Sequence, residues 1–71
     1  MVATEHVGLR RLLHAAMRRS RELALPQAAV DIQKAIDQNR PQDGAAIALT
    51  VLRRYDPGNS LIQLIDGYFR T

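Results

Sequence analysis

Apolar residues recur along the chain at spacings of three and four, a pattern that predicts α-helices. Between residues 4 and 24 they form one stripe, and Thr4 is a candidate cap at its start. Nowhere do β-branched residues alternate with polar ones as they do in a strand. The stripe consists of Leu9, Leu12, Leu13, Ala16, Met17, Leu23 and Ala24.

Prolines divide the rest of the chain into segments of helical length. Pro26 suits the first turn of a second helix over 26–38, because a helix needs no N–H donor there. The stretch 39–44 predicts a turn, with Asp43 as the cap of a third helix over 44–55.

The last segment follows a second turn, the sequence Asp-Pro-Gly-Asn at 56–59. Asn59 or Ser60 is a candidate cap for a final helix over 60–69. The whole chain, 1–71, is therefore expected to form a single all-α domain, a small bundle of three to four helices. The expected buried residues are Leu12, Ala16, Ile32, Ile36, Leu49 and Leu52.

Residues 26–59 span 34 positions and resemble one tetratricopeptide repeat, with Pro57 as the closing proline. Three positions depart from the repeat's pattern: Ala29 replaces a large aromatic residue, Gln33 stands where a small one is usual, and Ile36 replaces tyrosine. The resemblance implies a TPR-like helix-turn-helix hairpin, with Ala45 where the two helices approach closely. One such unit cannot bury its apolar face alone, so the flanking helices or a second chain must cover it. Small or apolar residues stand at the repeat's expected core positions, which are Ala29, Ile32, Ile36, Ala45, Leu49 and Leu52.

The net charge of +3 comes from the first third of the chain. Residues 1–24 carry five arginines against two glutamates, whereas residues 25–71 carry equal numbers of basic and acidic side chains. Such a basic stripe suits an acidic protein, a phosphate backbone or an anionic membrane surface. Its members are Arg10, Arg11, Arg18, Arg19 and Arg21.

The sequence offers little catalytic chemistry. It has no cysteine, and its two histidines, His6 and His14, lie eight residues apart without nearby carboxylates at ligand spacing. The glycines form no phosphate-binding loop, and no serine pairs with a base. We therefore expect a non-enzymatic protein without a cofactor or metal. The absence of a long apolar run or a signal-like start predicts a cytoplasmic protein.

Apolar helix faces exceed what so small a core can bury, which favours a protein–protein interaction module such as an adaptor or co-chaperone. We expect Ile62 and Phe69 to face outward and to pair two copies in a homodimer. Nucleic-acid binding through the arginines of the first helix is the alternative, and binding of that helix to a membrane surface is the weakest hypothesis. The candidate partner-binding residues are Ile47, Val51, Ile62, Tyr68 and Phe69.

Overall fold

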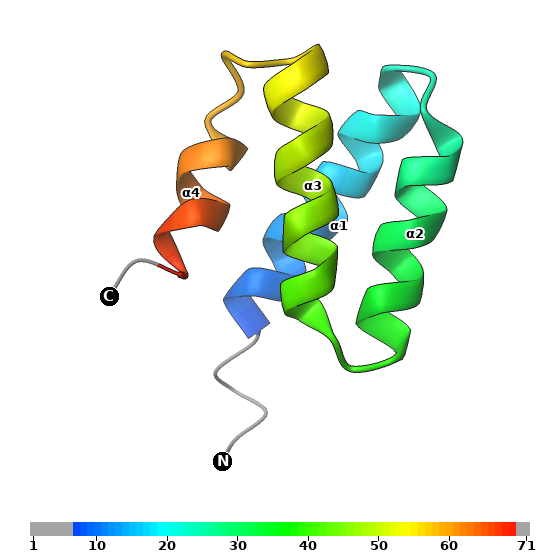
Figure 1. Ribbon diagram of the computed structural model, residues 1–71, viewed down its shortest axis with the longest axis vertical. Helices are drawn as coiled ribbons and strands as arrows, with labels where there is room; N and C mark the ends of the chain where they lie inside the picture. The colour runs from blue at the N-terminus through cyan, green and yellow to red at the C-terminus, as the bar shows by residue number, and fades with distance from the viewer. Residues whose placement is uncertain (1–6, 70–71) are drawn as a thin grey trace.

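The computed structural model describes residues 7–69, which form four α-helices and contain no strand. The predicted all-α bundle is thus confirmed. In Figure 1, α2, α3 and α4 stand next to one another in the order α2, α3, α4, and α1 runs behind them in contact with all three. The helices are α1 (Val7–Glu22), α2 (Pro26–Asp37), α3 (Pro41–Tyr55) and α4 (Leu61–Gly67). Thr4 and His6 lie outside the described residues.

Each helix supplies one large side chain that is completely buried: Leu13, Ile32, Leu52 and Ile65 all have 0% exposure. Around them the core is filled chiefly by alanine, which lets the helix backbones approach closely. The remaining buried apolar side chains are Leu9, Ala16, Met17, Ala29, Ala35, Ala45 and Ala48.

Half of the expected core is confirmed: Ala16, Ile32 and Leu52 are buried. The other three expected residues, Leu12, Ile36 and Leu49, are half-buried and pack against the edge of the core. Neighbouring residues on a helix point about 100° apart, so only one of Leu12 and Leu13 can face the centre of the bundle.

Gly44 of α3 lies where three helices approach one another closely. A Cβ atom at this position would lie 3.2 Å from Leu13 Cδ1, 3.3 Å from Ala35 Cβ and 3.7 Å from Ile32 Cγ2. The expected turn at 39–44 is confined to its first residues, and the expected helix start at residue 44 is wrong. α3 begins at Pro41, because proline suits the first turn here as it does at Pro26.

The α1–α2 and α2–α3 connections have the same geometry. Each helix is followed by a left-handed residue, Ala24 (φ 63°) or Asn39 (φ 59°), then by one extended residue and a proline. The amide after the left-handed residue bonds back to the helix: Leu25 N to Ser20 O at 2.8 Å, and Arg40 N to Ala35 O at 2.7 Å. These are Schellman ends, which satisfy carbonyls that the helix leaves unpaired.

Replacing Ala24 by glycine should stabilise the fold. The left-handed conformation costs a residue with a Cβ about 1–2 kcal/mol, whereas glycine adopts it freely. After the added chain entropy of glycine, we expect the unfolding free energy to rise by about 0.5–1 kcal/mol. Urea unfolding measures the change. The control is Ala46→Gly, at an exposed position in the middle of α3, and its unfolding free energy should fall by about 1 kcal/mol. A lower unfolding free energy in both variants would contradict the prediction.

Leu52→Asp should unfold the domain. A chain of this length has about 4–10 kcal/mol of stability, and truncating a buried leucine alone removes about 2–5 kcal/mol. The aspartate would add an unpaired charge in a core without water. Circular dichroism should show loss of helix at 25 °C. The control Leu64→Asp, at a side chain that is 53% exposed, should keep the wild-type spectrum.

Candidate interaction surfaces

A groove of about 300 Å³ runs between α3 and α4. Its walls are apolar, with Leu49 on α3 facing Phe69, which follows α4 and remains 46% exposed. Only two of its six lining residues are polar. The lining residues are Gln42, Ala45, Ala46, Leu49, Asp66 and Phe69.

A second hollow of about 270 Å³ lies on α3, lined by Ala46, Ile47, Thr50 and Val51. Ala46 lines both hollows, so the two apolar depressions meet at this small, exposed residue. We call the lining residues of the two hollows together the α3 surface.

The predicted partner-binding residues do not all meet on this surface. Ile47, Val51 and Phe69 lie on it. Tyr68 is 44% exposed, but its hydroxyl end lies against Gly8 of α1, away from the groove.

The expectation that Ile62 faces outward is wrong. Ile62 is half-buried against the core, and Leu64 is the exposed large apolar residue of α4. Ile65 is the buried anchor of this helix, and residues three and four positions before it, Ile62 and Leu61, share its face. Leu49 was missed as a surface residue, because its spacing matches the expected core stripe of α3. Ala46 was missed because a lone alanine carries no signal for a binding surface.

The arginine stripe contains one free arginine fewer than expected. Arg10, Arg11, Arg18 and Arg21 are exposed on the outer face of α1. Arg19 is not free: its Nε donates to Asp56 Oδ2 at 2.8 Å, and its Nη1 pairs with Glu22 Oε1 at 3.0 Å. The sequence could not separate Arg19 from its neighbours, because its acidic partner lies 37 positions away.

Asp56 joins the α3–α4 turn to α1. Besides the Arg19 bond, its carboxylate accepts Asn59 Nδ2 at 2.9 Å, and Asn59 Oδ1 accepts the Leu61 amide at 2.8 Å. Asn59, not Ser60, is thus the residue whose side chain caps the start of α4. The Asn59 hydrogen bond, followed by that of Arg19, holds the pKa of Asp56 below its ordinary value, and the same contact raises the pKa of Arg19.

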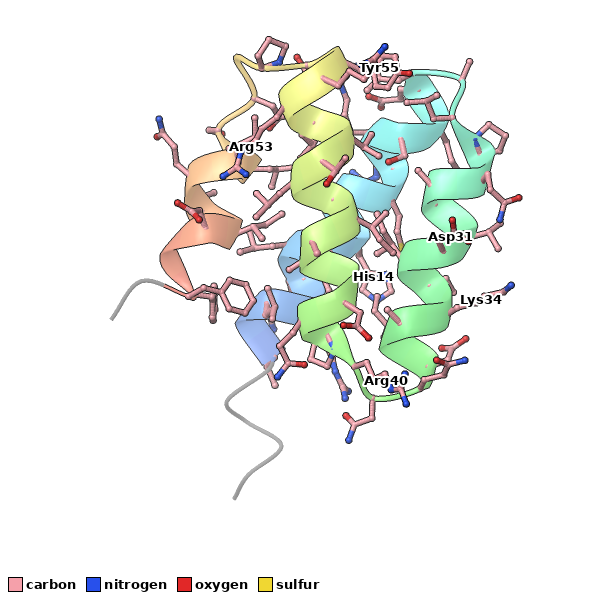
Figure 2. The ribbon with its side chains drawn as sticks, viewed as in Figure 1. His14, Asp31, Lys34, Arg40, Arg53 and Tyr55 are labelled. Atoms are coloured by element: carbon pink, nitrogen blue, oxygen red, sulfur yellow. The ribbon has the colours of Figure 1, made fainter. Side chains whose placement is uncertain are left out.

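Other polar contacts frame the α3 surface and the end of the stripe. Figure 2 shows Arg53 on the side of α3 that faces α4, where its Nη2 lies 3.9 Å from Asp66 Oδ1. At the helix end, the Arg54 guanidinium lies 5.6 Å from the centre of the Tyr55 ring. Arg10 Nη2 donates to Asn39 Oδ1 at 3.2 Å, which brings the stripe next to the α2–α3 turn.

Within residues 7–69, no three His, Cys, Asp or Glu side chains gather as metal ligands would. No helix in this range is long and apolar enough to cross a membrane. The two candidate surfaces in the described part of the chain are the α3 surface and the outer face of α1.

No family model, curated protein or solved structure matches the chain. The tetratricopeptide resemblance of residues 26–59, now seen to cover α2, α3 and the following turn, stays a prediction.

The Asp56 contacts should make stability depend on pH in the acid range. Because its folded pKa is lowered, Asp56 stabilises the fold above its unfolded pKa of about 3.9, and this contribution is lost as pH falls through the folded pKa. Asp56→Asn should therefore be less stable than wild type at neutral pH and should lose less stability on acidification.

Urea unfolding at neutral and acid pH measures this difference. The control is Asp37→Asn, at an exposed aspartate whose partner is the neutral Gln33. It should lose stability on acidification nearly as wild type does. Parallel pH profiles for wild type and Asp56→Asn would contradict the assigned role of Asp56.

Proposed function

We propose that this protein is a non-enzymatic interaction module, an adaptor or co-chaperone, that binds an amphipathic helix of a protein partner on its α3 surface. The observation that carries the proposal is the pair of apolar hollows on either side of Ala46. A helix in a groove is recognised by apolar anchors at spacings of three and four, and two parallel depressions suit such anchors.

Two exposed residues near the middle of α3 favour close packing of a second helix. Ala46 and Thr50 are small and exposed, so a partner backbone can approach α3 at the short end of the usual interaxial range of about 8–10 Å. Larger apolar side chains stand on both sides: Leu49 and Phe69 toward α4, and Ile47 and Val51 on the other side. These would supply the buried centre of an interface.

Polar groups surround this apolar centre. Gln42 and Asp66 line the edge of the groove, and Arg53 lies close to Asp66. An apolar centre with a polar rim is the usual anatomy of a protein interface. The rim would orient the partner helix, since a charged group placed wrongly against Asp66 or Arg53 would be penalised.

A second copy of the chain is the first occupant to test, because pairing two α3 surfaces about a two-fold axis needs no other protein. This replaces the expected pairing through Ile62, which packs inward. Phe69, which the expected pairing also used, lines the groove of the α3 surface.

Ala46→Arg should weaken binding at the α3 surface by at least about tenfold, because a long charged side chain would stand between the two hollows. The fold should survive, since position 46 is exposed and arginine is a good helix former. Sedimentation at a series of concentrations measures self-association, and thermal melts check folding. Val30→Arg, at an apolar residue of α2 that is 46% exposed and off the surface, is the matched control.

If wild type is monomeric throughout, a photocrosslinking residue placed at position 46 tests for a different partner in the native host. A protein adduct formed from position 46 and absent from position 30 supports the proposal. The proposal would be overturned if the protein neither self-associates nor forms an adduct specific to position 46.

A further inference from the structure

We propose that the outer face of α1 binds the phosphate backbone of double-stranded DNA. Four arginines, Arg10, Arg11, Arg18 and Arg21, are exposed along this face. The one acidic side chain of α1, Glu22, is paired with Arg19, which also binds Asp56. The stripe thus faces solvent as cationic charge without a neutralising carboxylate of its own helix.

The arginines fall into two pairs along the helix. Arg10 and Arg18 are eight residues apart, which at 1.5 Å per residue is a separation of about 12 Å. The major groove of B-DNA is also about 12 Å wide. A helix lying across that groove would direct Arg10 and Arg11 to one strand and Arg18 and Arg21 to the other.

His14 lies between the two arginine pairs and carries no negative charge. His14 is exposed on the same face of α1, in the stretch that would lie over the groove. At the far end, the Arg10–Asn39 bond places the stripe beside the α2–α3 turn, where Figure 2 shows Arg40. Asp37 and Asp43 flank Arg40 in sequence, so the stripe itself provides the binding charge.

Two competing ligands fit less well. An interfacial membrane helix needs a free apolar face, but Leu9, Leu13 and Met17 are buried in the core. Single-stranded nucleic acid is usually held by stacking on aromatic side chains, and α1 has none. A regular array of phosphates on a rigid duplex matches a regular array of arginines on a rigid helix.

This surface is separate from the α3 surface. In Figure 1, α1 runs behind α3. The four arginines of the stripe are exposed, whereas the apolar stripe of α1 is buried against the other helices. A partner helix on α3 and a duplex on α1 would therefore not compete. The inference stands whether or not the α3 surface binds a protein.

Fluorescence anisotropy with a mixed-sequence DNA duplex of two helical turns tests the proposal. Four phosphate contacts predict that log K falls against log salt with a slope of about −3.6 between roughly 50 and 200 mM salt. The double variant R18Q/R21Q should bind at least about tenfold more weakly at low salt and should reduce the slope by about 1.8. Both positions are exposed, so the thermal melt should stay close to wild type.

The matched control is K34Q/R54Q, which removes the same charge from exposed positions of α2 and α3. DNA affinity and slope close to wild type in this variant support a specific role for α1. Equal weakening by the two double variants would overturn it, since only the total charge would then matter. The proposal would also be overturned if no DNA binding is seen at low salt. The same holds if phosphatidylserine vesicles or polyglutamate bind as tightly as DNA at equal charge.

Discussion

The packing of α1 against all three other helices is the contact on which the rest of the structure depends. Its stripe of Leu9, Leu13, Ala16 and Met17 faces a core made largely of alanine and one glycine, Gly44. Small residues let the helices approach closely, so dispersion contacts are dense although few large side chains are buried. Because the helices are packed so closely, larger apolar residues such as Leu49 stay only half-buried.

The use of α1 as the common support explains the two candidate surfaces. Because the apolar side of α1 is buried, its arginines lie on the solvent side. Because α1 covers the back of α3 in Figure 1, the α3 surface stays exposed to solvent. The Arg19–Asp56–Asn59 contacts hold the α3–α4 turn against α1 and so place α4 beside α3. The groove that ends at Phe69 depends on that placement.

Prediction from sequence succeeded where the physical signal is local. Periodicity alone predicted the all-α fold, and the reason given for Pro26 applies unchanged to Pro41. The start of α3 was misplaced because Asn-Arg-Pro-Gln-Asp-Gly has the composition of a turn, whereas only its first residues form one. For Ile62 and Leu64 both positions are apolar, and hydrophobicity gives no means to choose between them.

The sequence by itself determined the helices and the excess of arginine in the first one, because periodicity, proline and charge act through neighbouring residues. The tertiary structure alone decided which apolar face is buried and which arginine is paired. Arg19 and Asp56 lie 37 positions apart, and Ile65 is central only because the turn folds α4 back onto α1 and α3. Such contacts depend on the packing of whole helices, which no local pattern contains.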